Sequence, residues 1–287
     1  MSTIIPESEL VLNNDGSIYH LHLLPEELAE TVILVGDQNR VAEVSKHFDK
    51  IEVKKSKREF ITHTGFVGNK RISVVSTGIG TDNIDIVMNE LDALANINLK
   101  TREVNATPTS LKFIRIGTSG SLQDNLQVND ILVSSYGLGL DSLMQFYDYE
   151  ENDEISNMLN AIDEQLELLF VNPYLFKAPG DLFAQFSKHF NFGITATCCG
   201  FYAPQGRMLR AEAKYEDLIK RLSNIEVNGL RITNFEMETA AIYGMATLLG
   251  HEAVSVNAIL ANRINHTFSS NPGLIVESAI KRVLEII

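Results

Sequence analysis

Cysteine is scarce in this sequence and tryptophan is absent. The two cysteines are the neighbours Cys198 and Cys199, and adjacent cysteines rarely form a disulfide with each other. No histidine spacing around them indicates a zinc site, so we expect no metal centre. We expect reduced thiols and a cytoplasmic protein, because disulfides are uncommon in that compartment.

The sequence also lacks any feature of a membrane or secreted protein. No run approaches the roughly 18 apolar residues of a membrane span, and residues 1–9 have neither the basic nor the apolar region of a signal peptide. Lys and Arg number 24 against 37 Asp and Glu, which gives a formal net charge of −13. This charge argues against nucleic acid and acidic membranes as partners. If the substrate is an anion, the basic residues that bind it must be gathered locally.

The overall composition is that of a globular protein, with 45% hydrophobic and 21% charged residues. Short β-branched runs alternate with segments whose apolar residues recur at helical spacing. Strands are expected at 31–35, 70–76, 112–116, 131–135, 192–197, 231–234 and 252–260, with extended structure over 50–67. Helices are expected after 40, from 82, near 155–168, at 210–222, up to 249 and at 271–287, with a polar loop at 98–110. The alternation predicts an α/β fold, with a central mixed β-sheet flanked by helices.

The strand expected at 112–116 is the most informative stretch. It ends in Gly117-Thr118-Ser119-Gly120, where glycines let the backbone approach a ligand and the hydroxyls and peptide N–H groups suit an anion. Arg115 lies inside this otherwise apolar strand, so its guanidinium needs a partner. That partner is either a bound anion or a carboxylate in a structural salt bridge, and these residues alone favour neither.

Other stretches add weaker signals. The strand at 31–35 runs into Gly36 and a helix with Arg40 in its first turn, an anion-binding geometry that many βα units share. Gly78 and Gly80 resemble the start of a dinucleotide fingerprint, but Asn83 occupies the third glycine position, which disfavours NAD binding. Glu236-Met237-Glu238 precedes an apolar helix. Its carboxylates either bind a ligand or stabilise the helix dipole.

Seven separated motifs point to one family. They are Gly36-Asp37-x-x-Arg40, Arg58-Glu59-Phe60, Ser76-Thr77-Gly78-Ile79-Gly80, Arg115-Ile116-Gly117-Thr118-x-Gly120, Phe201-Tyr202, Glu236-Met237-Glu238 and Asn262-Arg263. In this order they resemble the nucleoside phosphorylases, in the group of the uridine phosphorylases and the hexameric purine nucleoside phosphorylases, and the uridine phosphorylases most closely. The resemblance implies a single-domain nucleoside phosphorylase fold over 19–287, after a polar segment at 1–18. It also implies insertions near 98–110 and within 136–190.

The resemblance implies that phosphate attacks C1′ of a ribonucleoside and releases the base and ribose 1-phosphate, without a cofactor. The phosphate-binding residues it implies are Gly36, Arg40, Arg58, Arg115 and Thr118. Arg58 is expected to reach in from a neighbouring subunit. Planar guanidinium groups pair well with phosphate oxygens, and they would supply the local positive charge that the acidic composition requires.

The same resemblance also implies which residues bind the nucleoside. The ribose-binding residues implied are His20, Thr118, Glu236, Met237 and Glu238, with His20 donated across a dimer. Carboxylates accept hydrogen bonds from vicinal hydroxyls, and a methionine offers an apolar wall. The base-binding residues implied are Phe201, Gln205 and Arg207, of which Phe201 stacks on the base. The expected catalytic residues are Arg207, Gln205 and Arg115, and Arg207 would stabilise negative charge on the departing base.

Two departures from the uridine phosphorylase pattern bear on these assignments. Pro204-Gln205-Gly206 is closer to the Pro-Asp-Gly of purine enzymes than to the usual Pro-Gly-Gln. Purine enzymes, however, place an acid after the late strand, where this chain has Ala261-Asn262-Arg263, which favours a pyrimidine. Asn83 replaces a serine that helps Glu59 to bind a structural monovalent cation in the family, and no ion is predicted here.

Uridine is therefore the expected substrate, with phosphate as co-substrate, in a homodimer or homohexamer with shared active sites. Alternatives are a purine nucleoside phosphorylase, a nucleosidase that uses water, and a nucleoside-binding homologue with altered catalysis. Three arginines directed at phosphate disfavour a nucleosidase, which has no anion to hold.

Overall fold

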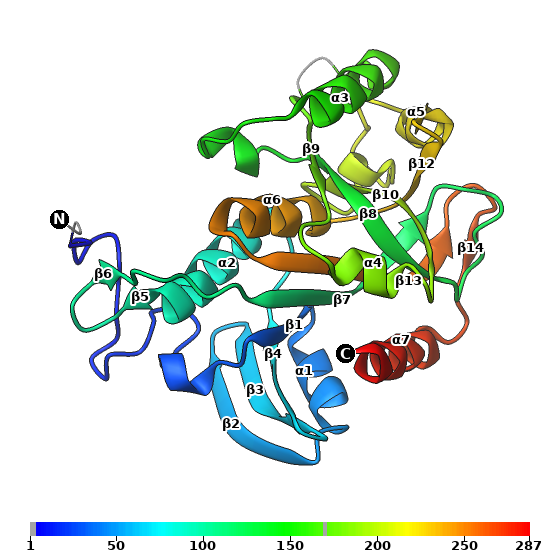
Figure 1. Cartoon of the computed structure of the whole chain (residues 1–287). Helices are drawn as coiled ribbons and strands as arrows, with labels where there is room; N and C mark the ends of the chain where they lie inside the picture. Colours follow the sequence, from blue (N-terminus) through cyan, green and yellow to red (C-terminus); the bar gives the residue numbers. More distant parts are fainter. Residues whose placement is uncertain (1–3, 169–170) are drawn as a thin grey trace.

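The computed structural model describes residues 4–168 and 171–287. Within them, a mixed 12-stranded sheet forms the centre of the molecule, in the order β11-β12-β10-β8-β13-β7-β1-β4-β3-β2 (Figure 1). The strands of this sheet are β1 Thr31–Val35, β2 Lys50–Lys57, β3 Phe60–Val67, β4 Lys70–Ser76, β7 Lys112–Ser121, β8 Ile131–Leu140, β9 Tyr174–Lys177, β10 Asn191–Cys198, β11 Glu226–Val227, β12 Leu230–Glu236, β13 Glu252–Asn262 and β14 Thr267–Phe268. The helices are α1 Gln38–Ser45, α2 Thr81–Asn96, α3 Asp153–Leu166, α4 Leu182–Phe186, α5 Leu218–Asn224, α6 Thr239–Leu249 and α7 Pro272–Ile286. The predicted α/β class with a central mixed sheet is confirmed.

Parallel pairing sets where the strand ends lie. Strands β1, β4, β7 and β13 pair in parallel, with Leu34 opposite Arg115 and Arg115 opposite Ser255. Their carboxyl ends therefore meet at one edge, the usual place for a ligand in an α/β sheet. Strand β12 also pairs with β7 through Phe235 and Gly120. This extra pairing closes β7, β13, β8, β10 and β12 into a ring.

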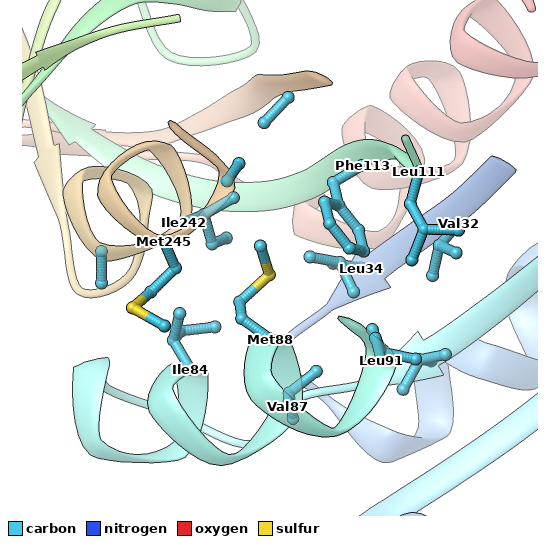
Figure 2. Close-up of a cluster of buried hydrophobic side chains, with 14 of the residues drawn as sticks. Val32, Leu34, Ile84, Val87, Met88, Leu91, Leu111, Phe113, Ile242 and Met245 are labelled. Atoms are coloured by element: carbon cyan, nitrogen blue, oxygen red, sulfur yellow. The ribbon is translucent and has the colours of Figure 1, made fainter. Parts of the chain in front are cut away.

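Successive side chains of the central strands point to opposite faces of the sheet, and a hydrophobic core forms on each face. Val32, Leu34 and Phe113 pack against α2 and α6, where Met88 lies near Ile242 (Figure 2). The intervening side chains of β1 and β7 pack on the opposite face against α1, α4 and α7. Burying a side chain of this size contributes about 1.5–3 kcal/mol, so both faces hold the carboxyl edge in place. A third cluster lies beneath α3 and α5.

Several strands run further than their sequence pattern indicates. Strand β7 does not end at Ile116. It continues through the Gly117–Gly120 stretch to Ser121, because β13 and β12 both pair with it there. Strand β8 likewise extends to Leu140, paired with β10. Pairing partners, which local sequence does not reveal, set these ends.

The prediction of a helix over 210–222 is wrong. Only Leu218–Asn224 forms a helix, because Leu218 and Leu222 reach the core while most of 210–217 is exposed. The loop expected at 98–110 includes part of a small hairpin, β5 Ile97–Asn98 with β6 Glu103–Val104. Short 3-10 turns are formed by Pro25–Glu27, Leu143–Phe146 and Ala203–Gln205.

Residues 4–18 pack against the rest of the chain. Leu10 and Ile18 are buried, and the Ile5 amide donates a hydrogen bond to the Arg102 carbonyl. The division into a segment at 1–18 and a domain at 19–287 stays a prediction, and residues 1–3 of that segment and 169–170 of the second insertion lie outside the described residues. In the described part of the chain, no helix has both the length and the apolar character needed to cross a bilayer.

Candidate active site

One cavity of about 780 Å³ opens at the carboxyl edge of the sheet. It gathers ten of the twelve residues that the motifs assign to phosphate, ribose and base. These ten are Gly36, Arg40, Arg115, Thr118, Phe201, Gln205, Arg207, Glu236, Met237 and Glu238. The two that do not line it are His20 and Arg58, the pair expected to serve a neighbouring subunit.

The Arg115 side chain is buried and also borders the cavity. It folds back over Gly117, where an added Cβ would lie 1.7 Å from Nη1. Its Nη2 is 2.5 Å from Glu238 Oε2 and 3.0 Å from Glu236 Oε2. Burial opposes the charge on Arg115, but the two carboxylates outweigh burial and raise its pKa. Carboxylates therefore do pair with Arg115, as the structural alternative required.

The two glutamates have different partners. Both oxygens of Glu236 accept hydrogen bonds from the Thr239 amide, at 3.0 and 3.1 Å, so Glu236 binds the first turn of α6. The helix-stabilising alternative thus holds for Glu236. Glu238 Oε1 instead accepts from the Gly80 amide at 2.8 Å. Burial raises the pKa of the Glu238 carboxyl, while Arg115 acts in the opposite direction.

Arg40 supplies a second positive charge beside Arg115. It lies in the first turn of α1, and Asp37 begins that helix by accepting a hydrogen bond from the Asn39 amide. Its Nη1 donates to the Ile116 carbonyl at 3.3 Å. Within the described ranges Arg40 has no carboxylate within ion-pair distance, and burial together with Arg115 lowers its pKa. Its guanidinium is therefore available to an anion in the cavity.

The loop after β10 brings the predicted base-binding residues together. The Arg207 guanidinium lies 3.7 Å from the centroid of the Phe201 ring and donates to Gln205 Oε1 at 2.7 Å. Burial, followed by the nearby Arg263, lowers the pKa of Arg207 to about 10. Arg263 donates to the Gln205 and Gly206 carbonyls at 2.9 and 3.2 Å, so it holds the loop in place. Sequence reasoning gave Arg263 no role beyond the motif.

Asn262 does not line the cavity. It is buried, and its Nδ2 donates to the Gln123 and Leu126 carbonyls at 2.9 and 2.7 Å. Its side chain is thus engaged in holding loops, and it gives no direct support to a choice between pyrimidine and purine.

His20 and Arg58 lie together on a different part of the surface. His20 Nδ1 is 2.7 Å from Glu90 Oε1, and Glu90 also accepts from the His20 and Leu21 amides. Among the described residues, the Nε2 atom of the His20 ring forms no hydrogen bond. Arg58 lies in the turn between β2 and β3 with a positive φ of 55°. Neither side chain lines the cavity of its own chain.

Sequence reasoning missed other cavity residues, including Phe235, Leu260 and Phe268, and it considered the Ser119 hydroxyl only as a group suited to an anion. Phe268 lines the cavity only because β14 pairs with β13, which brings Phe268 opposite Ala261. No local signal marks it. Among the residues that the structure describes, no cluster of three or more His, Cys, Asp and Glu side chains could hold a metal ion.

A cavity of this kind at the carboxyl edge of an α/β sheet indicates an enzyme. Comparison with known proteins agrees and gives the family. The chain belongs to the phosphorylase superfamily, whose family model matches residues 30–286. The resemblance drawn from the seven motifs is confirmed.

Individual relatives include both uridine and purine nucleoside phosphorylases. The chain is 28% identical to the uridine phosphorylase of Thermococcus kodakarensis, over 94% of this chain and 88% of that protein. It is 24% identical to a DeoD-type purine nucleoside phosphorylase of Buchnera aphidicola, over 88% of this chain and 90% of that protein. Among solved structures it resembles a Trypanosoma brucei nucleoside phosphorylase that shows uridine phosphorylase activity, with a TM-score of 0.88 and 26% identity. That match covers 97% of this chain and 98% of the other.

Proposed function

We propose that this protein is a uridine phosphorylase, an enzyme that transfers the ribosyl group of uridine to phosphate and yields uracil and ribose 1-phosphate. One observation carries the proposal. A single cavity combines two arginines suited to phosphate, two glutamates and a methionine suited to ribose, and an amide–guanidinium pair suited to a base. The uridine phosphorylases among the relatives support the same reaction.

Phosphate is held by the positive end of the cavity in this proposal. Arg40 and Arg115 offer charge-assisted hydrogen bonds, and Gly36 places backbone close to the first turn of α1. Thr118 adds a hydroxyl on the cavity wall. Arg58 of a neighbouring subunit completes the set. The reaction as proposed needs phosphate as co-substrate and no cofactor.

Ribose binds between the phosphate and the base. Glu238 accepts hydrogen bonds from ribose hydroxyls, Met237 packs against the sugar, and Glu236 acts mainly through its bonds to α6 and Arg115. His20 of a neighbouring subunit approaches with Nε2, the ring nitrogen that does not contact Glu90. The active unit is therefore at least a homodimer, and a homohexamer is compatible with the same sharing.

The base replaces the Arg207 guanidinium on the face of Phe201. In the free protein that guanidinium covers the ring at 3.7 Å, so a stacked base has to displace it toward the base edge. There Arg207 stabilises the negative charge that develops on the base as the bond to C1′ breaks. Gln205 is buried, and because its Oε1 accepts from Arg207, its Nε2 is the group that donates to a carbonyl of the base.

Phosphate-dependent consumption of uridine tests the proposal. Initial rates are measured for uridine, thymidine, cytidine, inosine and adenosine with and without phosphate. We expect uridine to have the highest kcat/KM and to be consumed only with phosphate. Faster cleavage of inosine or adenosine would identify a purine enzyme, phosphate-independent cleavage a nucleosidase, and binding without turnover an altered homologue. The cytoplasm is the proposed location, in keeping with the free thiols of Cys198 and Cys199.

A further inference from the structure

The ring of five strands carries a belt of six hydrogen-bonded polar side chains, two from β7 and one from each of the other four strands, and the belt begins and ends on β7. Arg115 Nη1 donates to Asn257 Oδ1 on β13 at 2.8 Å. Asn257 Nδ2 is 3.2 Å from Ser134 Oγ on β8, which is 2.6 Å from Thr195 Oγ1 on β10. The second half of the belt passes through Asn234.

On the far side of the ring, the belt returns to the cavity. Thr195 Oγ1 is 2.9 Å from Asn234 Oδ1 on β12, and Asn234 Nδ2 is 3.0 Å from Ser119 Oγ on β7. Ser119 and Arg115 are four residues apart on one face of β7, about 13 Å along the strand, and both line the cavity. The belt thus joins two places in the same cavity.

These groups are shielded from water. Asn257 and Asn234 are 0% exposed, Ser134 and Thr195 are 1% exposed, and Ser119 is 8% exposed. A buried polar group without a partner costs about 1–3 kcal/mol, so the protons in the belt have to be distributed without conflict. Solvent cannot correct a wrong orientation.

Arg115 fixes the direction of the whole belt. A guanidinium can only donate, so the atom of Asn257 that faces it is the carbonyl oxygen, and Nδ2 has to donate to Ser134. Thr195 gives its single proton to Asn234 Oδ1, so Ser134 is the donor to Thr195. Every group therefore donates to the next one along the belt.

The last member of the belt is left with a proton to give. Ser119 Oγ accepts from Asn234 Nδ2, and among the described residues no acceptor is recorded for the Ser119 hydroxyl. Since Ser119 borders the cavity, its O–H is available to an acceptor atom of a ligand there, such as a carbonyl or ring oxygen of the nucleoside.

We propose that Asn257 is a positioning residue of the active site, which holds the Arg115 guanidinium against phosphate and, through the belt, makes Ser119 a hydrogen-bond donor to the nucleoside. This inference rests on the proposed function, because it needs phosphate and nucleoside to share the cavity. Asn257 acts through Arg115 and touches no substrate itself.

The test uses Asn257→Ala, Asn257→Thr and Ser119→Ala in the full chain. Asn96→Ala is the matched control, because Asn96 is also buried and bonded, to Asp92 and to the Thr109 backbone, but does not line the cavity. Melting temperature, KM for phosphate, KM for uridine and kcat are measured for each. Phosphate binding without nucleoside is measured by titration calorimetry.

Both Asn257 variants are expected to raise the KM and the dissociation constant for phosphate about 10- to 100-fold, the effect of releasing a charged hydrogen-bonding group from its place. Ser119→Ala is expected to raise KM for uridine about 5- to 30-fold and to leave phosphate binding unchanged. Asn96→Ala is expected to lower the melting temperature without changing either KM. Asn257→Thr suits a strand and serves if Asn257→Ala does not fold.

The proposal is overturned if Asn257 variants bind phosphate as the wild type does, or if Asn96→Ala changes phosphate KM as much as they do. It is also overturned if Ser119→Ala leaves KM for uridine unchanged. A wild-type protein that binds phosphate but does not cleave uridine would overturn the proposed function alone, because calorimetry still reports whether Asn257 positions Arg115. A wild-type protein that binds no phosphate would overturn both.

Discussion

Arg40→Met should separate phosphate binding from folding more cleanly than any other single change in the cavity. Arg40 lies half-buried in the first turn of α1, and no carboxylate in the described part of the chain pairs with it. Burial and the neighbouring Arg115 both lower its pKa, which means that the folded protein holds this charge at a cost. Methionine keeps much of the side-chain length and removes the charge.

The expected loss follows from the contacts that Arg40 would make. One guanidinium that stabilises a transition-state anion contributes on the order of 2–4 kcal/mol, which corresponds to about 30- to 1000-fold in kcat/KM for phosphate. The free energy of unfolding should stay the same or increase, because only the hydrogen bond to the Ile116 carbonyl is lost and a desolvated charge is removed.

Initial rates over a range of phosphate concentrations, at saturating uridine, measure the effect, and a thermal melt measures stability. Lys46→Met is the control. Lys46 follows the same helix and pairs with Glu277 at 2.7 Å, outside the cavity, so this variant removes one positive charge without touching the site. If Arg40→Met kept wild-type kcat/KM for phosphate, or fell no further than Lys46→Met, Arg40 would not bind phosphate.

Three other predictions follow from particular contacts. Arg115→Ala should lower stability by about 3–5 kcal/mol as well as phosphate use, because it leaves buried carboxylates without a partner, and adding Glu238→Gln should recover part of that loss in a urea melt. Mixing His20→Ala with Arg115→Ala subunits should restore activity that neither has alone, and a mixture without activity after subunit exchange would count against shared sites. Two hydrogen bonds from Ser17 lower the pKa of Asp15 to about 2, below its unfolded value. Its contribution to stability is therefore present above pH 4 and lost as the pH falls toward 2, so Asp15→Asn should flatten the melting temperature between about pH 4 and pH 2.

The sequence by itself determined the central strands and the chemistry at their ends. The runs at 31–35 and 70–76 form strands with those same bounds, because their valines and isoleucines favour a buried strand and the two runs pair with each other over their length. Gly36, Arg40 and Arg115 follow or lie in such strands. Parallel pairing then brings them to one edge, and for that reason most of the motif residues were found in one cavity.

Only the tertiary structure decided which partners those residues have. Nothing near Asn257 in the sequence marks it, and the sequence marks Ser119 only as a hydroxyl suited to an anion. The belt that joins them draws its side chains from five strands and exists only where β12 closes on β7. The prediction of a helix over 210–222 was wrong for a related reason. A pattern of spacing cannot show that most of 210–217 has no core to pack against. Local periodicity specifies an element, whereas hydrogen-bond direction, burial and ring closure depend on residues far apart in the chain.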